Sequence, residues 1–498
     1  MPRVTPTIAG LIADHARDSP TSPFLEDARS ERVLHYGDLA TVVAAWHDVF
    51  SELTLPPSAA VLIDVDDPLA IAVLQLAAIS AGLRATTVDA GRSASEVERI
   101  SGLIRGAALV VSDRGADRPA AGAARAAVAG DGHPVDVVPA ETAPTASEPS
   151  GSGSSVLFTS GSTGTPKGVE LPEAQLLFVA AQVVETHGIA PEDRGFNPLP
   201  LSHVNPQVVG VLSTLVAGST LVLDARFRRT GFWELLHERR ITWINAVPAI
   251  LAVLARTGEL DPPETLRFVR CASAPLPDHV REAFAGRSVI LSWGMTEAAS
   301  QITSTPLLDA AVAAGVGWPR GSEVQVRRAD GGLAEPGEPG DLFLRGPGIV
   351  THYLFDAVPD RFDADGWLAT GDLGAIEPDG SITLAGRSDD VINRGGEKVY
   401  PGEVEEVLLG DPRVLEAVVV GRPDAILGTV PVAYVIAVAP DEIDPEELVA
   451  DLTARCTEHL VGFRRPVQVT VVADLPRAPA GKVRRSEVRQ LAADSASA

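Results

Sequence analysis

The stretch of sequence that decides the fold is VLFTSGSTGTPKG, residues 156–168. Residues 156–158 are apolar and predict a short buried strand. The glycines that follow let the backbone turn tightly around an anion, while hydroxyl groups, backbone amides and Lys167 can donate to phosphate oxygens. The loop is not of the Walker A type, because Pro166 stands where that motif has a glycine and Gly168 follows the lysine. We therefore predict a phosphate-binding loop of another class. Its expected contact residues are Thr159, Ser160, Gly161, Ser162, Thr163, Gly164 and Lys167.

The composition is that of a globular protein with more than one domain. The chain has 498 residues, of which 45% are hydrophobic, and a formal net charge of −25. So negative a chain is not expected to bind nucleic acid or anionic lipid, and an anionic substrate would need a locally basic site. The two cysteines, Cys271 and Cys456, are far apart, which argues against a disulfide framework or a cysteine zinc cluster.

No segment predicts secretion or membrane insertion. The first twenty residues lack the basic, apolar and small-residue succession of a signal peptide. The apolar runs at residues 69–79 and 208–222 are too short or too interrupted to span a bilayer. We expect a cytoplasmic protein without a membrane partner.

The order of elements predicts an α/β fold with partly parallel sheets. Strands are expected at residues 60–65 and 220–223, each followed by a helix, at 68–81 and 232–239. Residues 113–155 are rich in Ala, Gly, Pro and Ser and are expected to form a loose surface segment, and residues 331–340 a hairpin loop. A small α+β domain follows the boundary, with helices at 402–409 and 445–459 and strands at 414–420, 430–438 and 467–472. We predict two domains, residues 1–388 and 389–498.

The phosphate loop resembles the signature of the adenylate-forming (AMP-binding) superfamily of acyl-CoA synthetases, peptide-synthetase adenylation domains and luciferases. Further motifs of the superfamily follow in its order between about residues 34 and 485. The resemblance implies a large N-terminal domain of layered α/β sheets with a β-barrel-like section, and a small mobile α+β C-terminal domain. It also implies ATP and Mg²⁺ as cofactors.

The resemblance assigns nucleotide-binding roles to four further segments. Glu297 is expected to support the Mg²⁺ on the triphosphate, since a carboxylate suits that hard cation. Asp372 is expected to bind the ribose hydroxyls together with Arg387, and Asp389 to act as the hinge. The segments expected to flank the adenine are Ser273, Ala274 and Pro275, and Trp293, Gly294, Met295 and Thr296.

The implied chemistry is attack by an acid's oxyanion on the α-phosphorus of ATP, with loss of pyrophosphate. Positioning and positive charge supply most of such catalysis, and a carboxylate needs no general base at pH 7. Lys482 matches the superfamily's C-terminal catalytic lysine, which would bridge the acid and the α-phosphate. In the second half-reaction the small domain would swing and bring Lys398 to the AMP phosphate. The Glu-Lys-Val-Tyr-Pro run around Lys398 is more similar to CoA ligases, so we expect CoA as acceptor.

The sequence departs from the superfamily's motifs at two places, which leave the acid pocket and the acceptor open. The segment at residues 197–206 occupies the place of the CoA-ligase motif that lines the acyl pocket. It keeps His203 but has Ser202 and Pro206 where that motif has an aromatic residue and a glycine. Leu291 stands where relatives carry a polar residue that reads adenine. Residues 271–276, 295–307 and 392–398 resemble the oxalate–CoA ligase branch.

Three interpretations therefore stay open. The first is an AMP-forming acid–CoA ligase with Lys482, Lys398 and His203 as catalytic candidates. The second is an adenylating enzyme with another acceptor, such as a stand-alone carrier-protein ligase or a nitrite-dependent diazotase that joins activated nitrite to an aryl amine. The third is an inactive nucleotide-binding relative, against which the retained lysines and carboxylates argue.

Overall fold

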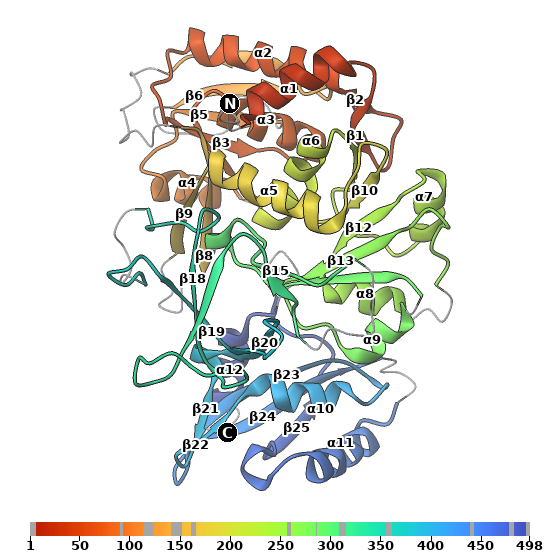
Figure 1. Ribbon diagram of the computed structural model, residues 1–498, viewed down its shortest axis with the longest axis vertical. Helices are drawn as coiled ribbons and strands as arrows, with labels where there is room; N and C mark the ends of the chain where they lie inside the picture. The colour runs from red at the N-terminus through yellow and green to blue at the C-terminus, as the bar shows by residue number, and fades with distance from the viewer. Residues whose placement is uncertain are drawn as a thin grey trace.

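The computed structural model describes residues 6–89, 93–113, 123–140, 152–160, 166–255, 260–284, 286–307, 315–354, 361–438, 443–477 and 483–494. Figure 1 shows these residues arranged along one long axis, with the N-terminal elements in red and orange at one end and the C-terminal elements in blue at the other. The α/β fold class is confirmed: two mixed sheets with their helices are followed by an antiparallel section and a smaller α+β unit.

The first sheet has seven strands and carries the predicted strand before the phosphate loop. In spatial order they are β7 (Pro134–Val138), β6 (Ala124–Val128), β5 (Leu109–Ser112), β3 (Ala60–Asp64), β4 (Arg84–Thr87), β8 (Ser154–Ser160) and β9 (Pro166–Pro172). All pairs are parallel except β6–β7 and β8–β9. The prediction of a loose segment over residues 113–155 is wrong in part, because it contains β6, β7 and the start of β8.

The second sheet also has seven strands, and only its last pair is antiparallel. In spatial order they are β14 (Ser288–Ser292), β13 (Phe268–Ala272), β12 (Trp243–Ala246), β10 (Arg194–Asn197), β11 (Thr220–Leu223), β1 (Pro23–Asp27) and β2 (Val33–His35). Parallel strands end at the same edge of a sheet. We call the edge where β10, β12, β13 and β14 end the carboxyl edge, and ligands of α/β sheets bind beyond such an edge.

Helices join the two sheets through one large hydrophobic core. That core takes side chains from both sheets and from α2, α3, α5 and the π-helix η1. The helices of this part are α1 (Ile8–Asp18), α2 (Tyr36–Glu52), α3 (Pro68–Ser80), α4 (Ala94–Leu103), α5 (Glu173–His187), η1 (Pro206–Leu212), α6 (Ser213–Ala217), α7 (Phe232–Glu238), α8 (Pro248–Ala255), α9 (Asp278–Ala283) and the 3₁₀ turn η2 (Thr296–Ala298). Helix α3 is apolar on all sides and is almost wholly buried, as such a pattern requires.

An antiparallel section follows the second sheet. A two-stranded ribbon, β15 (Thr303–Ser304) and β16 (Trp318–Pro319), precedes a four-stranded sheet. The strands of that sheet are β17 (Glu323–Arg327), β18 (Gly340–Arg345), β19 (Leu368–Ile376) and β20 (Ile382–Arg387). β17 and β18 pair antiparallel around residues 331–340, so the predicted hairpin is confirmed. This section stands where the β-barrel-like part was expected.

Residues from 392 onward build a sheet and two hydrophobic clusters of their own. Its strands are β21 (Ile392–Arg394), β22 (Glu397–Val399), β23 (Val414–Asp424), β24 (Gly428–Ala437) and β25 (Gln468–Val471). The helices are α10 (Pro401–Leu409), α11 (Pro445–His459) and α12 (Arg485–Asp494), with 3₁₀ turns η3 (Ser388–Asp390) and η4 (Gly462–Arg464). The helices and strands predicted for this region are confirmed within a few residues. Within the described ranges, no helix is long and apolar enough to cross a membrane.

Candidate active site

The predicted phosphate loop connects two strands of a hairpin in the first sheet. β8 ends at Ser160 and β9 begins at Pro166, and Thr159 lies opposite Lys167 in the antiparallel register. Gly161, Ser162, Thr163 and Gly164 lie outside the described residues. The hairpin places Lys167 one residue after the start of β9, directly beyond the loop.

Lys167 belongs to a buried group of three side chains. It is 8% exposed, and its Nζ lies 5.4 Å from the centroid of the Tyr353 ring. The Tyr353 hydroxyl donates a 2.8 Å hydrogen bond to Glu297 Oε1. Burial, and next the positive charge of Arg361, lower the pKa of Lys167, while burial and then the charge of Glu297 raise that of Tyr353.

This arrangement suits a magnesium–polyphosphate ligand better than a bare metal ion. No group of three or more metal-binding side chains occurs among the residues that the structure describes. Glu297 is buried and is held by Tyr353 through one oxygen. A Mg²⁺ ion here would therefore take its remaining ligands from nucleotide oxygens and water, as is usual for this cation.

Asp372, on β19 of the antiparallel section, joins two other predicted residues. Its Oδ2 accepts a 2.9 Å hydrogen bond from Trp293 Nε1, and its Oδ1 accepts one of 3.0 Å from Arg387 Nη1. Its backbone amide donates to Thr370 Oγ1 at 2.9 Å. Gly371 has a φ of 74°, and a Cβ at that position would lie 2.3 Å from Arg361 Nη2. The positive φ favours glycine at this position of β19, where the Arg361 guanidinium approaches the backbone next to Asp372.

The predicted adenine segments follow β13 and β14 at the carboxyl edge. Ser273, Ala274 and Pro275 are exposed directly after β13. Trp293 is 6% exposed and packs in an apolar cluster, with its backbone amide donating to Thr303 Oγ1 at 3.1 Å.

Gly294 starts a tight loop after that tryptophan. A Cβ on this glycine would lie 1.3 Å from the carbonyl oxygen of Ser300, so only glycine fits. Met295 and Thr296 are half-buried between Gly294 and the buried Glu297.

The segment that departs from the CoA-ligase motif lies between β10 and η1. His203 is half-buried in a turn, where its amide donates to the carbonyl of Pro200 at 3.1 Å, and Ser202 hydrogen-bonds to Asp89. Pro206, at the position of the expected glycine, starts the π-helix. π-Helical turns are frequent at functional sites.

Three predicted residues lie elsewhere or outside the described ranges. Lys482 is not among the described residues. Lys398 is exposed on β22, and Figure 1 shows β22 at the far end of the C-terminal unit from β8 and β9. Asp389 is exposed in η3, and its carbonyl accepts from Arg489 Nη2 of α12 at 3.4 Å. This arrangement therefore does not bring Lys398 to the phosphate loop.

Sequence reasoning missed several polar residues of this region. Tyr353 has no local signal, because its contacts with Lys167 and Glu297 depend on the Gly168–Leu354 bridge beside β9. The buried amides Asn197 and Asn245 had a signal, since asparagine is uncommon inside strands.

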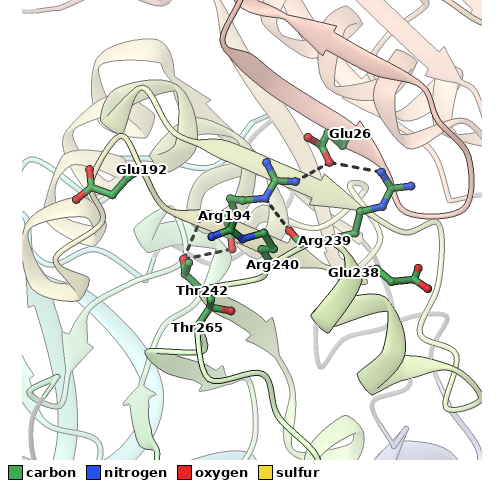
Figure 2. A pocket seen from close by; sticks show the side chains of 8 residues that line it. All are labelled: Glu26, Glu192, Arg194, Glu238, Arg239, Arg240, Thr242 and Thr265. Atoms are coloured by element: carbon green, nitrogen blue, oxygen red, sulfur yellow. Dashed lines mark hydrogen bonds and ion pairs between the residues drawn. The ribbon is translucent and has the colours of Figure 1, made fainter.

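A polar pocket at the opposite end of the second sheet is separate from this site. Figure 2 shows its lining residues, Glu26, Glu192, Arg194, Glu238, Arg239, Arg240, Thr242 and Thr265. Arg194 is the first residue of β10, so the pocket lies at the amino ends of the strands. Arg194 Nη2 donates to Glu26 Oε2 at 2.7 Å. The charge of Arg194 is paired with Glu26, and the pocket lies at the opposite edge of the sheet from the carboxyl edge. The pocket therefore has no part in the site described above.

Comparison with known proteins identifies the class. The family model described as AMP-binding enzyme matches residues 12–354, and the model described as AMP-binding enzyme C-terminal domain matches residues 403–482. The first match covers more than half of the chain. The chain therefore belongs to the AMP-binding enzyme family, and the family predicted from the motifs is confirmed.

The similar curated proteins are acid–CoA ligases. The chain is 38% identical to a sulfoacetate–CoA ligase of Cupriavidus necator over 66% of the chain and 65% of that protein. It is 34% identical to an oxalate–CoA ligase of Arabidopsis thaliana over 68% of the chain and 67% of that protein. The matched region thus spans about two thirds of the length of these relatives.

The solved structures extend the similarity over nearly the whole chain. The o-succinylbenzoate–CoA synthetase of Bacillus subtilis in complex with its acyl-adenylate intermediate has a TM-score of 0.81 at 25% identity, over 96% of this chain and 97% of that one. A structure of the same enzyme in complex with ATP and a magnesium ion has a TM-score of 0.80 at 25% identity, over 97% and 98%. The predicted fold is confirmed by this match.

Proposed function

We propose that the chain is an AMP-forming acid–CoA ligase, which adenylates a small acid with ATP and transfers the acyl group to CoA. The observation that carries the proposal is the joining of Trp293, Asp372 and Arg387 by hydrogen bonds beside the carboxyl edge. These residues come from three predicted nucleotide motifs, and the folded chain gathers them at one place. The names of the relatives, which are CoA ligases for sulfoacetate and oxalate, support both the reaction class and the acceptor.

The nucleotide would lie across the residues described above. The phosphate loop and Lys167 would hold the triphosphate, and Asp372 with Arg387 would bind the ribose hydroxyls. The segments at residues 273–275 and 293–296 would flank the adenine. Glu297 would hold Mg²⁺, which would neutralise negative charge on the phosphate oxygens. Burial and the positive charges of Arg361 and Arg387 lower the pKa of Lys167, while the negative charges of Glu297 and Asp389 raise it, so cations and carboxylates both lie near this lysine.

The first half-reaction forms an acyl-adenylate. A carboxylate oxygen of the acid bonds to the α-phosphorus of ATP, and the bond from that phosphorus to the β-phosphate oxygen breaks, which releases pyrophosphate. Lys482 would neutralise charge on the acid and the α-phosphate in the transition state. In the second half-reaction the CoA sulfur attacks the acyl carbonyl, AMP leaves, and the thiol proton passes to solvent.

Two half-reactions in one site call for two arrangements of the C-terminal unit. We place the boundary between residues 1–388 and 389–498, with Asp389 as the hinge. In the second arrangement the β21–β22 turn would bring Lys398 to the AMP phosphate, and His203 would line the path of the acid and the acceptor. The exposure of Lys398 in the present arrangement supports such a movement.

The acceptor separates this proposal from its alternative. We place the enzyme in the cytoplasm, where ATP and CoA are both available. A screen would measure pyrophosphate release over small acids, nitrite included, with and without CoA, and would identify acyl-CoA by mass spectrometry. Acyl-CoA and AMP in equal amounts support the ligase. Pyrophosphate release with an adenylate that CoA does not consume, but that a carrier protein or an aryl amine does consume, would favour the other acceptors.

A further inference from the structure

Three polar side chains form a row across the carboxyl ends of neighbouring strands in the second sheet. Asn245 of β12 pairs in register with Arg270 of β13. On its other side it donates a 2.9 Å hydrogen bond from Nδ2 to Asn197 Oδ1 of β10. All three residues are fully buried, and the residues that precede two of them on the same strands, Ile244 and Val269, pack in an apolar cluster. We call Asn197, Asn245 and Arg270 the polar row.

Arg270 is the residue of the row that its surroundings do not satisfy. Its Nη2 donates to Ser292 Oγ at 3.3 Å, while Nε and Nη1 have no hydrogen-bond partner among the residues that the structure describes. No carboxylate within the described ranges forms an ion pair with it. Burial lowers the pKa of Arg270 to about 10, so the guanidinium remains charged at neutral pH. A buried charge without a counter-charge is strongly unfavourable, and a bound anion would remove that penalty.

Among the described residues, the groups next to Arg270 provide no internal anion. His187 of α5 packs edge-on against Phe268, with 5.7 Å between the ring centroids, and its buried Nε2 has no partner within the described part of the chain. Burial, and next the charge of Arg270, lower the pKa of His187 to about 3, so this imidazole is neutral. Asn245 Nδ2 is already engaged by Asn197 and Asn205, so this neighbour of Arg270 offers no counter-charge either. The two unsatisfied donor atoms of Arg270, Nε and Nη1, therefore describe a site for an anionic acceptor.

The polar row lies next to the residues proposed to bind the nucleotide. Arg270 lies on β13, three residues before Ser273. Its partner Ser292 is the last residue of β14 and directly precedes Trp293. Asn205, the residue before η1, covers the row and accepts from Asn245 Nδ2 at 3.0 Å. A small acid bound here would place one end at the polar row and its other end at the α-phosphate of the proposed nucleotide.

We propose that Arg270, flanked by Asn245 and Ser292, binds a second anionic group of the acid, the group that is not adenylated. The substrate class is then a small acid with two anionic groups, such as a dicarboxylate or a sulfocarboxylate. The inference rests on the proposed function and narrows it. An acid with a neutral end would leave the buried guanidinium unpaired, so the same residue that binds the second anion rejects uncharged analogues.

The test uses matched pairs of acids that differ in one charge. The pairs are oxalate and oxamate, malonate and malonamate, succinate and succinamate, and sulfoacetate and sulfamoylacetate. Pyrophosphate release gives kcat/KM for each acid with the wild type, Arg270→Met, Arg270→Lys and the control Arg240→Met, whose exposed side chain lies at the opposite edge of the sheet. The wild type should prefer the dianion in at least one pair. Arg270→Met should lower kcat/KM for that dianion by about 10- to 100-fold and change its amide less than about threefold. Arg270→Lys should fall between.

A second readout does not depend on turnover. The preferred dianion should raise the thermal unfolding midpoint of the wild type and Arg240→Met, but not that of Arg270→Met. The assignment of Arg270 would be overturned if Arg270→Met lowered kcat/KM equally for a dianion and its amide. It would also be overturned if the wild type preferred the dianion in none of the pairs. If no acid releases pyrophosphate, the proposed function fails, and the thermal shift alone decides whether Arg270 binds dianions. If Arg270→Met does not fold, Arg270→Lys decides on the same two measurements. If Arg270 were only structural, Arg270→Lys would lower kcat/KM equally for the dianion and its amide.

Discussion

The indole Nε1 of Trp293 donates a 2.9 Å hydrogen bond to Asp372 Oδ2, across 79 positions of sequence. This contact joins the loop after β14 to the strand β19 of the antiparallel section. It also fixes one oxygen of the carboxylate while Arg387 holds the other. Asp372 is therefore held in one orientation, and in its proposed role at the ribose this would reduce the entropy cost of binding.

Removing the Asp372 carboxylate should weaken ATP binding. Asp372→Ala loses charge-assisted hydrogen bonds to the ribose worth about 1.5–3 kcal/mol, or roughly 10- to 150-fold in affinity. Trp293→Phe keeps an aromatic ring but loses the N–H group, so it should weaken the free energy of ATP binding by about 1 kcal/mol. Isothermal titration calorimetry with ATP measures both. Wild-type affinity in Asp372→Ala would show that this carboxylate does not bind the ribose.

Tyr353 should act as a positioning residue for Glu297. Tyr353→Phe removes the hydroxyl that donates to Glu297 Oε1 and leaves the ring beside Lys167. We expect the Mg²⁺ concentration for half-maximal pyrophosphate release to rise several-fold, with a smaller change in the maximal rate. Glu297→Gln should show the same change more strongly. An unaltered Mg²⁺ dependence in both variants would remove Glu297 from the metal site.

Gly294 should be essential for the fold of the loop after β14. Gly294→Ala places a methyl group 1.3 Å from the carbonyl oxygen of Ser300, so the backbone must move. We expect a loss of at least about 2 kcal/mol in the free energy of unfolding. Gly102→Ala, in helix α4 with open space around its Cβ position, is the matched control and should stabilise by up to about 1 kcal/mol. Chemical denaturation compares the two, and equal stability would contradict the geometry.

Lys482 should matter in the transition state and much less in nucleotide binding. Lys482→Ala should lower the rate of adenylate formation by at least a hundredfold, about 3 kcal/mol, while ATP affinity changes little. Stopped-flow pyrophosphate release and calorimetry on the same preparation separate the two effects. An unchanged rate would mean that another residue neutralises the α-phosphate.

The hinge should separate the two half-reactions. Asp389→Pro fixes φ near −65° and removes an amide donor, so it should impede the swing without altering the ATP site. In a single-turnover experiment the adenylate should still form, while acyl transfer to CoA falls steeply. Loss of both steps together, or of neither, would count against the swing.

The sequence predicted the elements of the fold well because their signals are local. Strand and helix bounds around β3, α3, α10 and α11 agree with the structure to within about a residue. β6 was missed because its alanines have low strand propensity, although the strand is buried between β5 and β7.

The candidate site likewise combines residues that have a local sequence signal with contacts that depend on the tertiary structure. Its motif residues were found by resemblance, but the contacts of Tyr353 and Trp293 span 56 and 79 positions and depend on tertiary structure. Arg270 did have a local signal, a charge inside an apolar strand. Its lack of a counter-charge is visible only in the folded chain.

Oxygen transfer from the acid tests the central claim most directly. With an acid from the screen labelled with ¹⁸O in its carboxylate, the reaction runs with ATP, Mg²⁺ and CoA, and mass spectrometry reads the products. Attack of the carboxylate on the α-phosphorus predicts one ¹⁸O in the phosphate of AMP and none in pyrophosphate. Unlabelled AMP, or label in pyrophosphate or inorganic phosphate, would contradict an acyl-adenylate and with it the proposed function.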